Sequence, residues 1–188
     1  MVEMTRGEES ILAQGRLLEL VTQEVMINGK VKTFEFARRA PGVRLIVSAL
    51  DNSWKILLSR EYRSELDRYD YRLPGGKVFD TLVEFHEYMD NSFLMKSAIE
   101  KAVTREAKEE IGITVQDMKH ISTSACGATI IWDLHYYEVS DYMMGEQELE
   151  DGEIITYDFY DSETVRQRCL DGTIDEERSA IILLKYLS

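Results

Sequence analysis

The chain has 188 residues, of which 44% are hydrophobic and only two are proline, so its composition predicts one folded domain, alone or with a small appendage. Its formal net charge of −13 disfavours nucleic acid or an acidic membrane as a partner, but leaves room for a small anionic ligand accompanied by metal ions. No apolar run reaches the roughly 18 residues of a membrane span, the first ten residues do not resemble a secretory signal, and the two cysteines lie far apart, so we expect a cytoplasmic protein with free thiols.

The first predicted element is a β-hairpin within residues 21–40. Asn28 and Gly29 form the dipeptide that is typical of a type I′ turn, and hydrophobic residues alternate with polar ones around it. The alternation gives the hairpin an apolar face without an obvious core of its own. We therefore interpret residues 1–40 as a β appendage and residues 41–188 as the main domain.

Two strands, a Pro-Gly-Gly loop and a helical region are predicted next, at residues 42–50, 54–62, 73–78 and 81–111. The helical region is expected to break at residues 90–92. Ser97 and Glu100 have the spacing of a capping box, which would start the second helix there, and Gly112 stands where a C-cap glycine belongs.

The rest of the chain predicts three further strands and two helices, at residues 118–125, 132–140, 153–161, 161–172 and 175–187. Ser162 or Asp161 is expected to cap the first of these helices. Strands and helices do not alternate strictly, so a layered α/β fold with a mixed sheet is favoured over a doubly wound one.

The sequence REAKEEIGI, at residues 105–113, gathers three carboxylates on one helix face. Glu106, Glu109 and Glu110 are spaced by three or four residues, so their side chains project together, and Arg105 is placed to pair with Glu109. Such a face is either a solvated acidic surface or a set of hard oxygen ligands for a divalent cation. The helix alone does not decide between the two.

This helix and the loop before it resemble the signature of the Nudix hydrolase family, Gly-x5-Glu-x7-Arg-Glu-U-x-Glu-Glu-x-Gly-U, in which U is a bulky apolar residue. Gly76 matches its first position, and its second half is matched by Arg105, Glu106, Glu109, Glu110, Gly112 and Ile113. The first glutamate of the signature aligns with Ser97. Residues 77–96 separate Ser97 from Gly76, where the signature has five residues, so about residues 79–96 are interpreted as an insertion.

The insertion leaves two questions open. Glu84 or Glu87 could replace the missing glutamate, or both could lie on a solvated helix face. The segment also carries large apolar residues mixed with acidic ones, which must be buried somewhere. We expect it to pack over the mouth of the site as a lid, with packing against a second subunit as the alternative.

Other parts of the chain resemble the ADP-ribose pyrophosphatase branch of the family. That branch has an N-terminal β-hairpin, an arginine at the position of Arg39, and a Gln-Tyr-Arg sequence similar to the REYR that ends at Arg63. Its acidic loop and its Gly-x-Ile-x-Asp segment are similar to ELEDGE and GTID here. Its Ser-Pro-Gly is replaced by a segment with Ala125, and a later glutamate by Ile130, which weakens ADP-ribose specificity in particular.

The resemblance implies a Nudix fold, which is an α/β/α sandwich with a mixed β-sheet, plus the hairpin. It implies Mg²⁺-dependent hydrolysis, with Mn²⁺ as a substitute, of a nucleoside diphosphate linked to a moiety X, such as ADP-ribose or a nucleotide sugar. The products are a nucleoside monophosphate and phosphorylated X. The alternatives are a Nudix hydrolase of another substrate (a dinucleoside polyphosphate, a nucleoside triphosphate or a coenzyme) and a ligand-sensing domain without catalysis.

The resemblance also implies roles for single residues. Glu106 and Glu110 would be the principal Mg²⁺ ligands, joined by the carbonyl group of Gly75 and by Glu153. The proton of the attacking water would pass to Glu109 or to Glu153.

Glu150 and Asp151 are rival candidates for that base. Arg105 would orient a glutamate of the motif, and Arg39 and Arg63 would hold substrate phosphates. The aromatic residues that could either stack on a nucleobase or belong to the core are Trp132, Tyr136 and Tyr137. Because the appendages of the resembled branch pack on a second subunit, we expect a homodimer. From the net charge, we expect that it binds neither nucleic acid nor a membrane.

Overall fold

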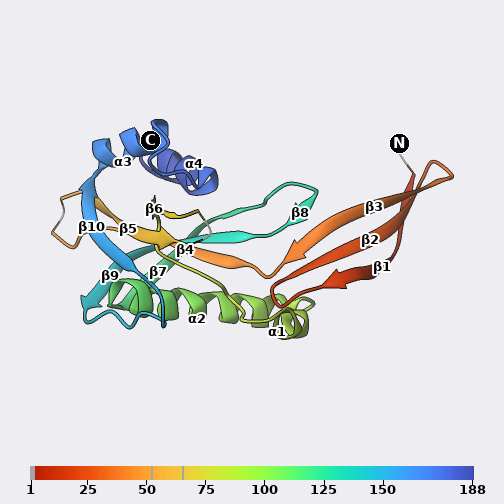
Figure 1. Ribbon diagram of the computed structural model, residues 1–188, viewed down its shortest axis with the longest axis horizontal. Helices are drawn as coiled ribbons and strands as arrows, with labels where there is room; N and C mark the ends of the chain where they lie inside the picture. The colour runs from red at the N-terminus through yellow and green to blue at the C-terminus, as the bar shows by residue number, and fades with distance from the viewer. Residues whose placement is uncertain (1–2, 52, 65) are drawn as a thin grey trace.

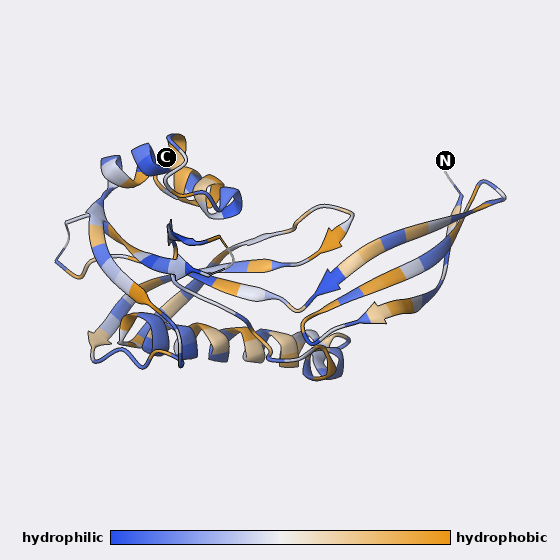
Figure 2. Ribbon diagram, viewed as in Figure 1, coloured by the Kyte–Doolittle hydropathy of each residue, from blue (hydrophilic) through white to orange (hydrophobic). Residues whose placement is uncertain are grey.

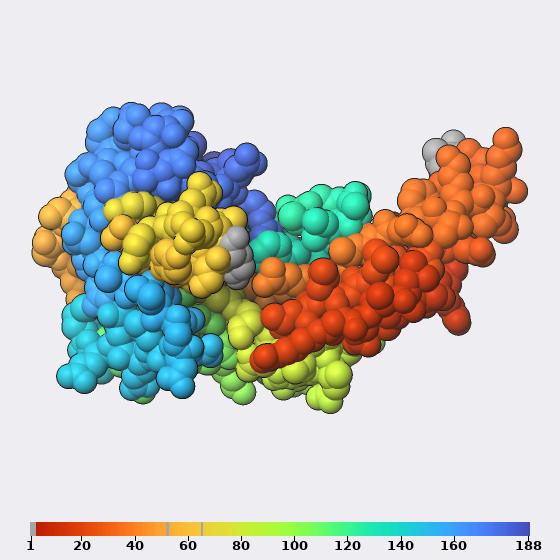
Figure 3. Space-filling model, viewed as in Figure 1, coloured from red at the N-terminus to blue at the C-terminus, as the bar shows by residue number. Residues whose placement is uncertain are grey.

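The computed structural model describes residues 3–51, 53–64 and 66–188 and shows a body from which a long β arm projects (Figure 1). The N-terminal strand lies in the arm and the C-terminal helix lies on the body. The space-filling view shows the same projection, with the outer end of the arm clear of the body (Figure 3).

The arm is a sheet of order β1-β2-β3-β8, formed by β1 (Met4–Gln14), β2 (Leu18–Ile27), β3 (Lys30–Arg39) and the short β8 (Ile130–Ile131). The predicted turn between β2 and β3 is confirmed, because Asn28 and Gly29 have φ angles of 49° and 75°, as a type I′ turn requires. Strand β1 adds a strand to the predicted hairpin. All side chains of β1 are exposed. Its sequence therefore has no alternation of buried and exposed residues from which the strand could have been predicted.

The body contains two three-stranded sheets. One has the order β4-β9-β7 and the other the order β10-β5-β6, with the bounds β4 (Gly42–Val47), β9 (Leu134–Met144), β7 (Ile113–Ser124), β10 (Ile155–Asp161), β5 (Lys55–Arg63) and β6 (Arg68–Arg72). Strand β4 runs parallel to β9, whereas the other pairs in the body are antiparallel. The sequence did not predict β6, whose five residues carry three charges.

Helices cover the body sheets on both sides, with α1 (Leu82–Tyr88) and α2 (Ser92–Ile111) below them in Figure 1 and α3 (Ser162–Leu170) and α4 (Glu177–Tyr186) above. Strand β4 shows why two cores form, because alternate residues of a strand point to opposite faces. Val43 and Leu45 pack in the core that contains α2, whereas Ile46 packs in the core that contains α3 and α4. The mixed α/β fold expected from the sequence is thus what the chain adopts.

Helix α2 begins earlier than the sequence predicted. The side chain of Asn91 accepts hydrogen bonds from the backbone N–H groups of Phe93 and Leu94, which makes Asn91 the N-cap. The prediction that Ser97 starts the helix is therefore wrong, because an earlier cap lets the helix run through it. The predicted C-cap is confirmed, since Gly112 is left-handed with φ 65°.

The inserted segment packs beneath the body and against the base of the arm. Phe79 and Leu82 are 2% and 1% exposed, so two of its large apolar side chains are buried in the chain's own interior. His86 lies 3.2 Å from the buried carboxylate of Glu19 on the arm. Arg16, also from the arm, donates a hydrogen bond to the backbone carbonyl of Asp80. The segment therefore connects the arm to α2.

No helix in the described ranges is long and apolar enough to cross a bilayer.

Cys126 is exposed and Cys169 is partly buried, and both are free thiols, as the sequence predicted. Figure 2 shows that the arm strands alternate between hydrophobic and hydrophilic residues although little covers them.

We predict that Gly112→Ala destabilises the protein. A side chain in left-handed backbone costs about 1–2 kcal/mol, and a Cβ atom here would also lie 2.8 Å from the backbone nitrogen of Gln147. The control is Gly29→Ala, where φ is similar but nothing lies within 4 Å of the added atom. Urea unfolding should give a clearly larger loss for Gly112→Ala, and equal losses would contradict the packing argument.

Candidate active site

A cavity of about 840 Å³ opens where the arm meets the body, and residues from several distant parts of the chain line it. Its walls come from the end of β3, strands β4, β5 and β6, the Pro-Gly-Gly loop, helix α2, the acidic loop at residues 150–153 and the segment before α4. This volume lies within the range of small-molecule sites. The predicted Pro-Gly-Gly loop, motif helix and acidic loop therefore lie around one space.

The motif helix α2 forms an acidic wall of the cavity. Glu106 and Glu110 are 7% and 8% exposed, and Glu109 lies at the more open edge. Arg105 pairs with Glu106 at 2.8 Å and with Glu109 at 3.6 Å, which confirms the pairing expected from the spacing. Arg105 also donates to the backbone carbonyl of Lys77, so it connects the helix to the loop.

Burial dominates the electrostatics of this wall. It raises the pKa of Glu110 to about 8, with the charge of Glu106 as the next cause, although the Gly75 amide and Arg44 oppose the shift. Burial likewise raises the pKa of Glu106, which Arg105 partly offsets. Burial raises the pKa of Glu109 as well, and Arg105 opposes this, while the charges of the acidic loop add to the rise. The negative charge of the wall is thus incompletely balanced.

The residues of this wall fit a hard divalent cation by their chemistry. Carboxylate oxygens are the ligands that Mg²⁺ prefers. A cation would also supply the positive counter-charge for the two neighbouring buried carboxylates of Glu106 and Glu110. Within residues 3–51, 53–64 and 66–188, no three acidic, histidine or cysteine side chains converge closely enough to hold an ion as they stand. Glu110 instead accepts a hydrogen bond from the Gly75 amide at 2.7 Å.

The two glycines of the loop allow the backbone to approach its neighbours closely. A Cβ atom on Gly75, whose φ is 133°, would lie 2.3 Å from the carbonyl oxygen of Val43, and one on Gly76 would lie 2.5 Å from the carboxylate of Glu106. The Gly75 carbonyl, expected as a metal ligand, accepts a hydrogen bond from Arg44 at 2.5 Å. The loop is thereby fixed between β4 and α2.

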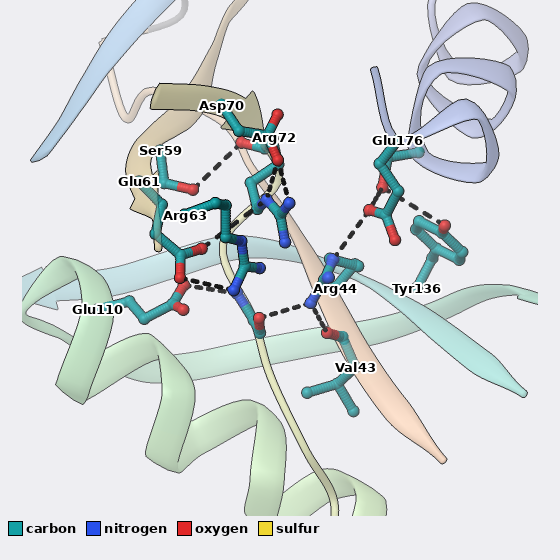
Figure 4. Close-up of polar contacts among 12 residues, drawn as sticks. Val43, Arg44, Ser59, Glu61, Arg63, Asp70, Arg72, Glu110, Tyr136 and Glu176 are labelled. Atoms are coloured by element: carbon teal, nitrogen blue, oxygen red, sulfur yellow. Dashed lines mark hydrogen bonds and ion pairs between the residues drawn. The ribbon is translucent and has the colours of Figure 1, made fainter. Parts of the chain in front are cut away.

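The other side of the cavity is rich in arginine, and most of these side chains have carboxylate partners (Figure 4). Arg63 pairs with Glu61 at 2.8 Å. Arg72 pairs with Asp70, and Arg44 pairs with Glu176 at 3.1 Å.

Arg39 differs from these arginines. Its guanidinium lies 4.4 Å from the ring centroid of Trp132, and in the described part of the chain it has no ion pair. Burial lowers the pKa of Arg39, and so do the charges of Arg44, Arg178 and Arg63. An unpaired cation among other cations attracts an anionic ligand.

The structure separates the alternatives for the other predicted residues. Glu150 and Glu153 line the cavity, whereas Asp151 does not. Trp132 lines it too. Tyr136 and Tyr137 are 0% and 4% exposed and belong to the cores, which decides between core and nucleobase stacking in favour of the core.

The inserted segment contributes little to the site. Only Phe79 and Asp80 of residues 79–96 line the cavity, so the expectation of a lid over its mouth is wrong. Glu84 and Glu87 do not line it, and neither replaces the missing glutamate of the motif here. Some of its apolar side chains, such as Phe79, pack in the core that contains α2. Others stay exposed, namely Val83, Met89, Phe93 and Leu94, at 39–78%.

Several charged cavity residues were missed by sequence reasoning, namely Arg44, Glu61, Asp70, Arg72 and Glu176. Arg44 had a detectable signal, because a single charge within the apolar GVRLIV predicts a buried partner. Asp70 and Arg72 lie on β6, which itself was missed. Glu176 is brought to the cavity by the packing of α4, and its local sequence carries no sign of that.

Comparison with solved structures shows a likeness along almost the whole chain. A structure described as the crystal structure of an ADP compounds hydrolase matches with a TM-score of 0.71 and covers 98% of this chain and 93% of its own, at 18% sequence identity. At that identity the likeness establishes the fold. No family model matches the sequence, and neither does any curated protein.

Asp70 predicts how stability depends on pH. Burial raises the pKa of its carboxyl group to about 7, and Asp175 beside it adds to the shift. The charge of Arg63 opposes this shift. The folded state then binds this proton more tightly than the unfolded state, so the free energy of unfolding should fall as pH rises from about 4 to about 7. Asp70→Asn should flatten that slope in urea unfolding.

The matched control is Asp117→Asn, at an exposed position on β7. It should leave the slope as it is in the unaltered protein. An unchanged slope in Asp70→Asn would show that this carboxyl group does not bind the proton.

Proposed function

We propose that the protein is a Mg²⁺-dependent Nudix pyrophosphatase that hydrolyses a nucleoside diphosphate linked to a second moiety, X, as in ADP-ribose or a nucleotide sugar. The products are a nucleoside monophosphate and phosphorylated X. The observation that carries the proposal is one cavity with the buried glutamates of α2 on one wall and the unpaired Arg39 on another. The likeness in fold to an ADP compounds hydrolase supports the same class.

The acidic wall would hold the metal. Glu106 and Glu110 are the proposed principal ligands, with Glu153 and the Gly75 carbonyl as further oxygen donors. Bound Mg²⁺ supplies charge neutralisation and Lewis acidity toward the diphosphate. Arg105 keeps the Glu106 carboxylate in place through their 2.8 Å contact.

Arg39 and Arg63 are proposed to bind the phosphates. The ring of Trp132 holds Arg39 without using its N–H groups, so these donors stay available for phosphate oxygens. Arg63 would contribute charge while bound to Glu61. Because the −13 chain repels free anions, these cations and the metal together account for how an anionic substrate is accepted.

Glu109 is the proposed proton acceptor, with Glu153 as the rival. Glu109 has the most exposed side chain of the three motif glutamates. Burial raises the pKa of Glu109, and the charges of Glu150 and Glu153 add to the rise. A base needs an affinity for protons and access to water, and Glu109 combines both. Trp132 also lines the cavity, but Arg39 and Arg178 already stack on its ring.

A substrate panel tests this function. ADP-ribose, nucleotide sugars, dinucleoside polyphosphates, nucleoside triphosphates and nucleotide coenzymes are each incubated with Mg²⁺, and phosphate is measured after phosphatase treatment. We expect the highest kcat/KM on a nucleoside diphosphate linked to X, loss of turnover with chelator, and recovery with Mg²⁺ or Mn²⁺. Binding of these compounds without any turnover would instead indicate a ligand-sensing domain.

Glu110→Gln is the variant that completes this test. It keeps the shape of the side chain but removes its charge, and kcat should fall by at least about a hundredfold. Glu100→Gln, on the same helix but outside the cavity, is the matched control and should keep its turnover. Near-normal turnover of Glu110→Gln would refute the role given to this residue.

The arm is proposed to form a homodimer. Residues paired across antiparallel strands project to the same face. Phe34 and Ile11 therefore lie on one face, and Leu20, Met26 and Val31 on the other, and all five are 41–56% exposed. Exposed apolar side chains on both faces of a projecting sheet are typical of a surface covered by another chain, and a second copy provides the same apolar strands.

We predict a dimer in light scattering at micromolar concentration, with an interface of about 1,600 Å² or more. Leu20→Glu should shift it toward the monomer, because a charge would have to be buried. Leu170→Glu, at a still more exposed leucine at the end of α3, should leave the dimer intact. A monomeric unaltered protein would rule the interface out.

A further inference from the structure

Arg44 is a charged residue in a strand that is otherwise apolar. Every residue of β4 is buried, and the Arg44 side chain is only 7% exposed. A buried guanidinium requires a counter-charge and acceptors for its N–H groups. The identity of those partners indicates what the charge does.

The partners of Arg44 lie at two separate places in the fold (Figure 4). Its Nε donates to the carboxylate of Glu176 at 3.1 Å, directly before α4, and Glu176 also accepts a hydrogen bond from Ser179 at 2.6 Å. Its Nη1 donates to the Gly75 carbonyl at 2.5 Å and to the Val43 carbonyl at 3.2 Å. Arg44 thus joins the start of α4 to the Pro-Gly-Gly loop.

Gly75 is held through both of its backbone polar groups. Arg44 binds its carbonyl, and the carboxylate of Glu110 accepts from its amide at 2.7 Å. Close packing against Val43 leaves no space for even one additional carbon atom at this position. A change at Arg44 therefore alters where the Gly75 amide lies, and with it where the Glu110 carboxylate lies.

We propose that Arg44 and Glu176 are positioning residues, which hold the Gly75 backbone and through it the Glu110 carboxylate in their working arrangement. This role rests on the proposed pyrophosphatase function. Neither side chain needs to touch the substrate. Glu176 fixes the guanidinium, the guanidinium fixes the loop, and the loop fixes the glutamate.

The test uses the double variant Arg44→Met/Glu176→Gln, because Arg44→Met alone would leave a buried carboxylate without a counter-charge and could unfold the protein. The double variant removes both charges and should melt close to the unaltered protein. Any loss in the site then reports positioning rather than global unfolding.

The first measurement is amide hydrogen exchange by NMR on protein labelled with ¹⁵N-glycine. The Gly75 amide should be protected in the unaltered protein and should exchange about tenfold faster or more in the double variant. The Gly112 amide, which donates to the Lys108 carbonyl at 3.1 Å, serves as an internal reference and should not change. Unchanged protection of Gly75 would overturn the proposal.

The second measurement is turnover of the best nucleoside diphosphate substrate. Because small misplacement of a reacting group is costly, kcat should fall about 10- to 100-fold, while KM should stay within about threefold. A double variant with normal kcat would show that the pair is only structural. If the unaltered protein turns over no compound of the panel, the proposed function fails, whereas the exchange measurement still tests the hold on Gly75.

A second buried arginine–glutamate pair provides the matched control. Arg38 and Glu19 lie 2.9 Å apart at the base of the arm, with side chains 10% and 0% exposed, and neither lines the cavity. The variant Arg38→Met/Glu19→Gln should leave Gly75 exchange unchanged. Faster exchange there would mean that loss of any buried pair loosens the loop, which would also overturn the specific role of Arg44.

Discussion

The hydrogen bond from the Gly75 amide to the Glu110 carboxylate joins the two segments on which the cavity depends. Burying a carboxylate near a second one costs free energy unless it has a hydrogen-bond donor and a nearby positive charge. Gly75 gives the donor, and Arg44 gives the charge. The loop must then pass so close to β4 that only glycine fits. The remaining features of the site, including the capped helix and the buried arginine, maintain this arrangement.

The cavity gathers positive charge within a chain that is acidic overall. The chain carries −13 overall, yet several arginines are collected around one cavity. Their carboxylate partners keep them buried and oriented, but also neutralise them. Arg39 is not neutralised in this way, because its guanidinium packs on the aromatic ring of Trp132 rather than against a carboxylate. Long-range repulsion and local attraction would therefore both act on an anionic ligand of the proposed kind.

Sequence reasoning predicted what depends on local pattern and failed where tertiary packing decides. The Asn28-Gly29 turn, the Gly112 cap and the placement of Glu106, Glu109 and Glu110 on one wall of the cavity follow from short-range spacing. The start of α2 and strand β6 were missed, because Asn91 competes with Ser97 as a cap and charged β6 lacks an apolar alternation.

The inserted segment was misjudged for a related reason. Its apolar residues indicated burial, but only part of them is buried, in the core with α2, whereas its contacts with the arm are polar and Val83 and Phe93 stay exposed. The roles of Asp70, Arg44 and Glu176 depend on partners far away in the chain. No window of sequence around Glu176 contains the information that it reaches Arg44.

The ion pair between Arg44 and Glu176 spans 132 positions of sequence, and this has a consequence for the order of folding. Contacts of such separation form late, since the intervening chain must be brought together first. During synthesis the arm, β4 and even the motif helix emerge before the segment that precedes α4 has been made. A nascent chain of that length would carry Arg44 without its counter-charge and without the helices that bury it. If Arg44 holds the Pro-Gly-Gly loop as proposed, the loop acquires its fixed form only when α4 docks, so the site is completed in one late step rather than gradually.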